Sequence, residues 1–133
     1  MRPARFQDFT LDLVKNSSDA THVQTLAEAG DSKHPRGLAI TTTAGEARWQ
    51  IVGQLAVGEK HTDPDTPVTD EPFRTWTEPK PGDHEGWFAA ALARAESPEI
   101  ANIERWSIRP GQQDKPGLTV FFHNGAKVFI RQL

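Results

Sequence analysis

LTVFFHNGAKVFIR, residues 118–131, is the stretch of sequence that decides the fold. It contains two runs rich in β-branched and aromatic residues, separated by Asn124-Gly125. An Asn-Gly pair between two such runs is the strongest short-range signal for a β-hairpin, because both residues tolerate the positive φ angles of a type I′ turn. The sequence therefore predicts an antiparallel hairpin here, closed by a two-residue turn.

A two-residue turn also fixes which residues face each other across the hairpin. It places Phe122 opposite Lys127 and Val120 opposite Phe129. One face then carries Thr119, Phe121, His123, Val128 and Ile130, and the other carries Leu118, Val120, Phe122 and Phe129, edged by Lys127 and Arg131. Both faces are apolar, so both need cover, either from the chain's own helices or from another subunit. Because large exposed apolar patches mark interfaces, the candidate interface residues are Phe122, Phe129, Lys127 and Arg131.

A second hairpin is expected earlier in the chain, with strands at 37–43 and 47–56 around a turn at Ala44-Gly45. The second of these strands alternates, with Ala47, Trp49 and Ile51 on one face and Arg48, Gln50, Val52 and Gln54 on the other. That alternation is typical of an antiparallel strand buried on one side only. A fifth strand is expected at residues 100–109, before a loop at 110–116.

Two or three helices accompany these strands. Residues 84–96 predict a helix with an alanine-rich apolar face,. Residues 19–29 predict another. Residues 4–15 fit either a helix or a strand by spacing, and Pro3 favours the helix because proline suits its first turn. Together these elements predict one α+β domain over residues 1–133, built on an antiparallel sheet of about five strands in two hairpins.

Composition narrows the function classes. The chain has 133 residues, no cysteine and a net charge of −3. Residues 58–99 carry ten acidic against four basic side chains, whereas residues 100–133 carry five basic against two acidic ones. This distribution makes nucleic acid an unlikely partner, because general nucleic-acid binders are basic overall. No apolar run approaches the roughly 20 residues of a membrane span, so we expect a cytoplasmic protein with no membrane partner.

Residues 58–82 form a long acidic segment that contains five prolines. Long loops inside compact domains are usually functional, so this one is a candidate lid over a small-molecule site. Within it, His61, Asp63 and Asp65 combine an imidazole with two carboxylates, which are ligands of divalent metals. The competing interpretation, a solvated acidic loop, is favoured, and no cofactor is predicted.

Asp83, His84 and Glu85 form a second candidate site, at the start of the helix expected at 84–96. They could act as an acid/base pair, but both carboxylates also suit the positive end of a helix, and capping is the favoured interpretation. No nucleophile motif or phosphate-binding glycine loop occurs in the sequence. We therefore assign no catalytic residue and lean against an enzyme.

Three hypotheses for function follow. The leading one is a non-enzymatic protein-interaction or assembly module that self-associates through a sheet face or edge. The second is a small-ligand-binding or sensing domain with the 58–82 segment as its lid, and the third is a metal-dependent hydrolase. Arginine outnumbers lysine nine to six, which fits a bacterial origin, including a mobile element of a GC-rich genome.

Overall fold

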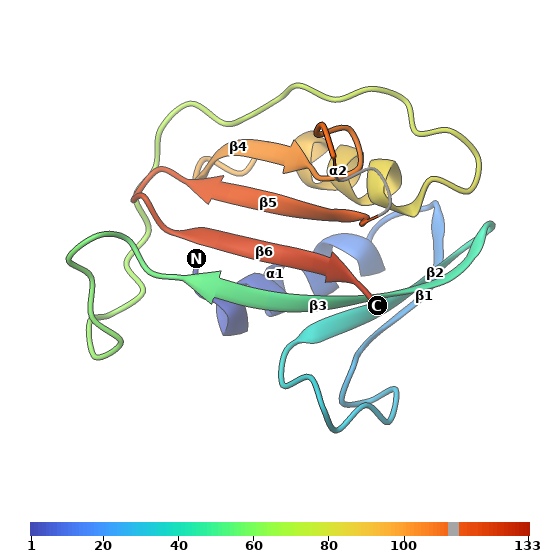
Figure 1. The fold of residues 1–133 in the computed structure, drawn as a ribbon, viewed down its shortest axis with the longest axis horizontal. Helices are drawn as coiled ribbons and strands as arrows, with labels where there is room; N and C mark the ends of the chain where they lie inside the picture. The colour runs from blue at the N-terminus through green and yellow to red at the C-terminus, as the bar shows by residue number, and fades with distance from the viewer. Residues whose placement is uncertain (112–114) are drawn as a thin grey trace.

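The computed structural model describes residues 1–111 and 115–133. It is an α+β structure with one antiparallel sheet of six strands and two helices (Figure 1). In chain order the elements are α1 (Pro3–Lys15), β1 (Ala20–Thr25), β2 (Gly37–Thr42), β3 (Gly45–Gln54), α2 (His84–Arg94), β4 (Ile100–Arg105), β5 (Gly117–Phe122) and β6 (Lys127–Gln132).

The strand order in the sheet is β1-β2-β3-β6-β5-β4, and every neighbouring pair is antiparallel. The β2–β3 and β5–β6 hairpins meet through β3 and β6, which puts these two strands at the centre of the sheet. The predicted class and both hairpins are therefore confirmed, and the structure adds a sixth strand. The first hairpin turns at Thr43-Ala44 rather than at the predicted Ala44-Gly45, because Thr42 already pairs with Gly45. The predicted strand at 100–109 ends at Arg105, because Trp106 begins a turn. The expected loop at 110–116 includes residues 112–114, which lie outside the described residues.

Residues 3–15 form a helix, as the proline at its first position favours,. Its buried side chains are Phe6, Gln7, Thr10 and Val14, which recur at helical spacing,. The Gln7 side-chain oxygen accepts a hydrogen bond of 2.8 Å from the backbone N–H of Gly37, which ties the helix to the start of β2.

The prediction of a helix at residues 19–29 is wrong. Residues 20–25 form β1, an edge strand that pairs with β2. Thr21, Val23 and Thr25 are β-branched at alternate positions, which favours a strand over a helix. The apolar spacing that indicated a helix comes partly from Leu26, which lies beyond the strand and is buried.

The register predicted for the C-terminal hairpin is wrong by one residue. The loop has three residues rather than two, because the backbone N–H of Phe122 donates to the carbonyl of Ala126 and Gly125 takes a positive φ of 91°,. Phe121 therefore faces Lys127, and Thr119 faces Phe129. A slip of one residue exchanges the faces of one strand relative to the other.

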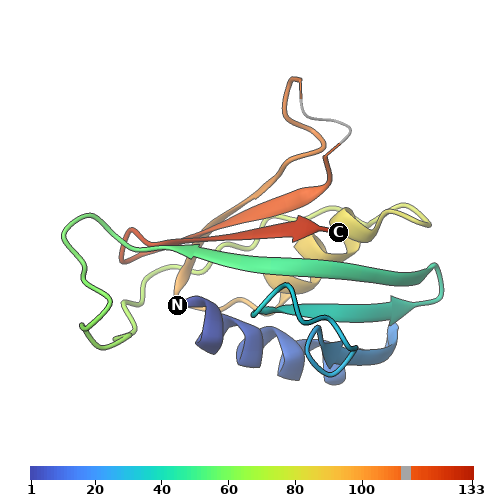
Figure 2. The ribbon, with the colours of Figure 1, turned by 60° about the horizontal axis from the view of Figure 1, so that its bottom comes forward.

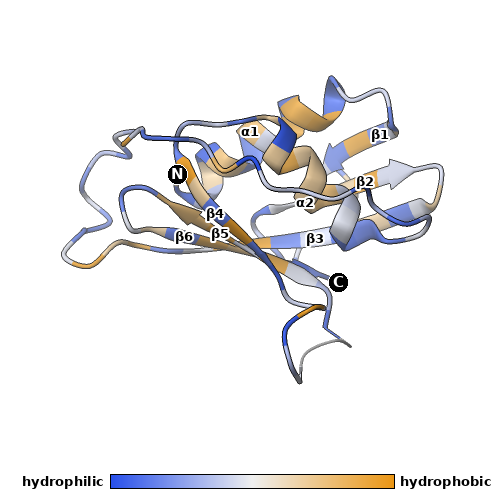
Figure 3. Cartoon of the chain, turned by 90° about the horizontal axis from the view of Figure 1, so that it is seen from above, coloured by the Kyte–Doolittle hydropathy of each residue, from blue (hydrophilic) through white to orange (hydrophobic). Residues whose placement is uncertain are grey.

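As a result, five large apolar side chains of the hairpin gather on one face, while Phe121 and Phe129 lie on the other. Leu118, Val120 and Phe122 of β5 are buried together with Val128 and Ile130 of β6. Both helices lie on this side of the sheet, with α1 against β1, β2 and β3 and α2 against β4 and β5 (Figures 2 and 3). The hairpin is thus covered on one face by the chain itself.

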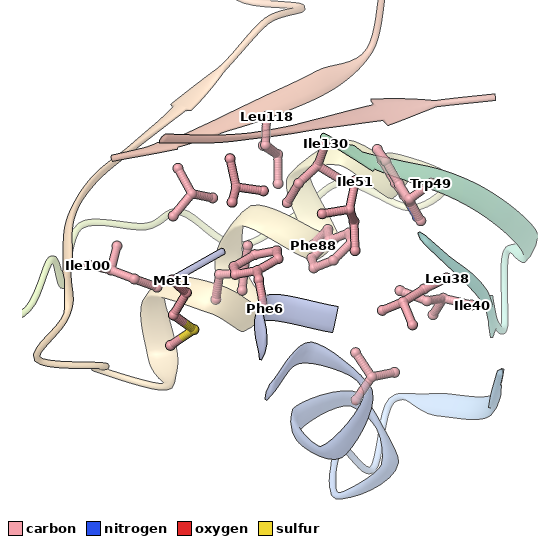
Figure 4. Packing of buried hydrophobic residues seen from close by; sticks show 14 of the residues in the cluster. Met1, Phe6, Leu38, Ile40, Trp49, Ile51, Phe88, Ile100, Leu118 and Ile130 are labelled. Carbon is pink, nitrogen blue, oxygen red and sulfur yellow. The ribbon is translucent and has the colours of Figure 1, made fainter. Parts of the chain in front are cut away.

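The core lies between the helices and this face of the sheet (Figure 4). Phe6 of α1 contacts Phe122 edge to face, with ring centroids 6.1 Å apart. Phe88 of α2 contacts Trp49 of β3 in the same way at 5.2 Å. The predicted alternation of β3 is confirmed, since Trp49 and its same-face neighbours are buried and the intervening residues are more exposed.

Residues 55–83 contain no helix or strand, yet contacts along their length hold them to the body. The backbone N–H of Asp70 donates to the carbonyl of Pro98, and that of Phe73 donates to the carbonyl of Ile100. The Trp76 ring lies under the guanidinium of Arg94, 4.9 Å from its centroid. The segment therefore passes along the outer side of β4, as Figure 1 shows.

Candidate functional site

The face of the sheet that no helix covers carries a patch centred on β6, which we call the open-face patch. It is formed by Val52 of β3, Phe121 of β5, and Lys127, Phe129 and Arg131 of β6. Phe129 is flanked by Val52 on one side and by Thr119 on the other. Val52 is 46% exposed and Arg131 is exposed, while the two phenylalanines are half-buried. The patch therefore combines an apolar centre with two cationic side chains.

Within the part of the chain that the structure describes, the two cations of the patch form no ion pair. Among the residues that the structure describes, no carboxylate lies within ion-pair distance of Lys127 or Arg131. The Lys127 ammonium instead lies over the Phe121 ring, 5.2 Å from its centroid. By contrast, Arg48 on the same face forms a 2.6 Å ion pair with Glu46. Two cations of β6 therefore remain available to an anionic partner.

Trp106 bounds the patch at the end of β4. Its ring packs against Gly117, where a Cβ would come within 2.3 Å of a ring carbon. Its indole N–H donates a hydrogen bond of 2.8 Å to the hydroxyl of Thr119. The guanidinium of Arg109 lies 5.6 Å from the ring centroid. Trp106 is thus fixed by its own neighbours.

Of the four predicted interface residues, the structure brings three together and separates the fourth. Lys127, Phe129 and Arg131 share the open face of β6. Phe122 is only 4% exposed and points toward α1, so it belongs to the core. Phe121, which the predicted register placed on the opposite face, takes its place in the patch. Which of Phe121 and Phe122 shares a face with Phe129 depends only on the length of the hairpin loop, and the Asn-Gly pair does not specify that length uniquely.

The predicted metal residues do not form a site. The Asp65 carboxylate accepts hydrogen bonds from the Arg5 side chain and from the backbone N–H of Arg2. Asp63 accepts instead from the backbone N–H of Lys60. Within residues 1–111 and 115–133, no group of three or more His, Asp or Glu side chains is placed to hold a metal ion. His61, Asp63 and Asp65 therefore give no ligand set.

Asp65 belongs instead to an ion cluster that fixes the acidic segment. Arg5 of α1 bridges two carboxylates, Asp65 at 2.9 Å and Glu99 at 2.6 Å. Hydrogen bonding to Arg5 lowers the pKa of Asp65 from 3.8 to about 2. The hydrogen bonds that Arg5 donates to Glu99 and Asp65 raise the pKa of Arg5 above its usual value. The cluster joins three regions that are distant in the sequence.

We predict that Asp65→Asn lowers the free energy of unfolding by about 1–2 kcal/mol at neutral pH. The lowered pKa of Asp65 alone corresponds to a slightly larger free energy. The side chain of Arg5 is 36% exposed, so solvent screening reduces the contribution of the ion pair,. Because the pKa is depressed in the folded state, the contribution is complete above about pH 5 and is lost between about pH 5 and 1. Urea titrations of both proteins across this range measure the difference. A difference that stays constant with pH would contradict the assigned ion cluster.

Asp83 caps α2, as the favoured interpretation has it. Its carboxylate accepts a hydrogen bond of 2.8 Å from the backbone N–H of Gly86 and lies 2.9 Å from a terminal nitrogen of Arg105. His84 follows it and lines a hollow of about 370 Å³ with Lys80 and Trp87. The acid/base arrangement therefore has no support from these contacts.

Glu85 is 2% exposed and organises the end of the β4–β5 pair. One carboxylate oxygen accepts from the Arg105 side chain at 2.7 Å and from the Ser107 hydroxyl. The other accepts from the backbone N–H groups of Ser107 and Gly117, at 3.1 and 2.9 Å. Burial acts to lower the pKa of Arg105, but its bond to Glu85 and the charge of Asp83 raise it above its usual value. Glu85 is therefore fully engaged in structure.

A groove lies beside β4, between the acidic segment and α2, and we call it the β4 groove. Its volume is about 430 Å³, within the range of ligand sites,. Gly86, Ala89 and Ala90 of α2 contribute to its lining, and the larger apolar side chains around it are Phe73, Trp76, Ile103 and Ile108. Phe73 and Trp76 belong to the 58–82 segment that we expected to act as a lid, and they line this groove together with residues from distant parts of the chain.

No known protein family, curated protein or solved structure matches this chain. Among the described residues, neither helix has the length and apolar character needed to cross a membrane. The geometry of the sheet and of the β4 groove is therefore the basis for a functional proposal.

Proposed function

We propose that this protein is a non-enzymatic interaction module that docks an acidic surface of a partner protein on its open-face patch. The observation that carries the proposal is the row Lys127, Phe129 and Arg131 on a central strand, where neither cation pairs with a carboxylate of residues 1–111 or 115–133. An apolar centre with a charged rim is the usual anatomy of a protein–protein interface. Unpaired cations at such a rim favour a partner of opposite charge.

The charge of the patch favours a different protein over a second copy of this chain. In a two-fold dimer the same patch meets itself, so Lys127 and Arg131 of one copy would lie near those of the other. Like charges in this position cost free energy. The expectation of self-association also rested on a register in which both hairpin faces are strongly apolar. In the structure Leu118, Val120, Phe122, Val128 and Ile130 lie on the helix-covered face, and only Phe121 and Phe129 of the hairpin's large apolar residues lie on the open face.

Single-stranded nucleic acid is a less favoured partner because aromatic faces suitable for base stacking are occupied. Lys127 lies over the ring of Phe121, and the ring of Trp106 packs against Gly117 and has the Arg109 guanidinium over it. Phe129 is left as the one ring of this group without a cation over it among the described contacts.

We predict that a peptide of alternating aspartate and leucine shifts the backbone NMR signals of residues 127–131 and 52. Lys127→Ala combined with Arg131→Ala should weaken this binding about tenfold or more, since two charge contacts are lost. Lys33→Ala combined with Lys80→Ala is the matched control. It removes the same charge from exposed positions outside the patch and should leave the affinity unchanged.

Other results would contradict the proposal. Oligothymidine that shifts the same signals while the acidic peptide does not would assign the patch to nucleic acid. A dimer in light scattering that Phe129→Glu converts to a folded monomer would assign it to a second copy. Equal losses in the two charge-matched variants would show that binding depends on net charge alone.

A further inference from the structure

Strand β4 is an edge strand, and its backbone decides what can bind beside it. It pairs with β5 alone in the sheet. In an antiparallel pair, residues alternate between pointing their backbone groups at the partner strand and away from it. The Trp106 N–H donates to the Gly117 carbonyl, so the backbone groups of Trp106 point at β5. By this alternation, the backbone N–H and C=O groups of Ile103 and Arg105 point away from β5, toward the β4 groove.

Only part of this edge is satisfied. The carbonyl of Ile100 accepts from the N–H of Phe73, and the N–H of Ile103 donates to the side-chain oxygen of Asn102 at 2.9 Å. Among the described residues, the carbonyl of Ile103 and both backbone groups of Arg105 have no hydrogen-bond partner within the protein. One end of the edge is thus closed by the acidic segment and the other end is open.

The β4 groove lies beside the open end. Ile103 and Arg105 form one of its walls, and Ala89 and Ala90 contribute to its lining from α2. Trp76 is 40% exposed on the wall formed by the acidic segment. An apolar hollow next to a row of unpaired backbone donors and acceptors matches an extended peptide, which supplies hydrogen bonds along one side and a side chain at every second position.

We infer that the β4 groove binds an extended, apolar segment of a partner protein, which pairs with Ile103 and Arg105 as a short seventh strand. The peptide backbone accepts from the Arg105 N–H and donates to the Ile103 carbonyl. One apolar side chain of the peptide then points into the groove against Ala89 and Ala90. This site is distinct from the open-face patch and does not depend on it.

The charges around the groove fit an uncharged segment. Arg105 is already paired with Asp83 and Glu85, at 2.9 and 2.7 Å. The Arg94 guanidinium lies over Trp76. A small apolar molecule would fill the hollow, but it would leave the backbone groups of Ile103 and Arg105 without partners, whereas a strand satisfies both.

The test uses a capped peptide of alternating valine and threonine, and the same peptide with a central valine replaced by proline. Binding of the first should shift the Arg105 amide NMR signal downfield and slow its hydrogen exchange. The proline peptide should bind less well, because proline lacks the N–H that donates to Ile103. An apolar dye, anilinonaphthalene sulfonate, serves as the small-molecule probe.

Two variants with opposite expected effects on peptide binding test the inference further. Ala89→Leu fills the groove and should weaken peptide binding about tenfold or more, whereas Ala27→Leu, at an exposed turn position, should not,. Asn102→Ala frees the N–H of Ile103 for the peptide and should strengthen binding several-fold. Asn102 is exposed, so this variant retains the fold even if Ala89→Leu does not.

The inference is overturned if the valine–threonine peptide does not bind, or if it binds without changing the Arg105 amide. Equal binding of the proline peptide would also overturn it. Displacement of the dye by small apolar molecules, with no effect of either peptide, would assign the groove to a small ligand instead.

Discussion

Phe122→Ala is expected to lower the free energy of unfolding by about 3–5 kcal/mol, which is a large part of the stability of a domain this size. Phe122 is buried and contacts Phe6 edge to face, so its removal leaves a cavity beneath α1. Phe129→Ala is expected to cost about 1 kcal/mol or less, because it removes only cross-strand contacts with Val52 and Thr119,. Urea unfolding followed by tryptophan fluorescence measures both.

This comparison tests the register directly. With a two-residue turn, Phe122 and Phe129 would share a face and the two substitutions would have similar effects. With the three-residue loop they lie on opposite faces. Phe121→Ala is the control on β5, next to Phe122 and on the open face. It should lose only its contact with Lys127, worth about 0.5–1 kcal/mol at an exposed site,. Equal losses at 122 and 129 would contradict the observed register, and equal losses at 121 and 122 would contradict the placement of Phe121 on the open face.

The difference between a two-residue and a three-residue loop could not be predicted from local sequence. An Asn-Gly pair suits both, since each needs a positive φ that glycine adopts easily. In the structure the side chain of Asn124 accepts a hydrogen bond of 2.9 Å from the backbone N–H of Ala126, which stabilises the longer loop. The register then follows from burial, because it collects Phe122 and the aliphatic residues of both strands under the helices,.

Predictions that rested on a single element were more robust than those that rested on pairing. Lys127, Phe129 and Arg131 alternate along one strand, so they share a face in any register. The position of Phe122 relative to them depends on the loop, and that prediction failed. The six residues of β1 are a related case, since pairing with β2 decides their structure more than their own apolar spacing does,.

The β4 groove shows a different limit. Its residues come from the acidic segment, from α2 and from β4 with the turn that follows it. No local pattern connects Trp76, Ala89 and Ile103, so only the fold could bring them together. The sequence did indicate that a 25-residue segment rich in prolines is rarely without a role in a compact domain,. The structure adds that this segment is fixed by Arg5 and by the edge of β4.

Glu85→Gln is the second substitution with a large expected effect, a loss of about 3 kcal/mol in the free energy of unfolding. Both oxygens of Glu85 accept hydrogen bonds, one from Arg105 and the Ser107 hydroxyl, the other from the backbone of Ser107 and Gly117. Glutamine keeps the shape but replaces one oxygen by an NH₂ group. In either orientation this group meets donors, and Arg105 loses its buried partner.

Glu104→Gln is the matched control for Glu85→Gln, because Glu104 also pairs with an arginine but is 38% exposed. Its ion pair with Arg109 is expected to contribute less than about 1 kcal/mol. The melting temperatures of the two variants should therefore differ clearly, since each kilocalorie per mole corresponds to several degrees in a chain of this length. The Trp106 fluorescence should also change in Glu85→Gln, because Glu85 holds the turn that follows Trp106. Similar melting temperatures would mean that Glu85 contributes no more than a surface carboxylate, and that the end of the β4–β5 pair is held by the strands themselves.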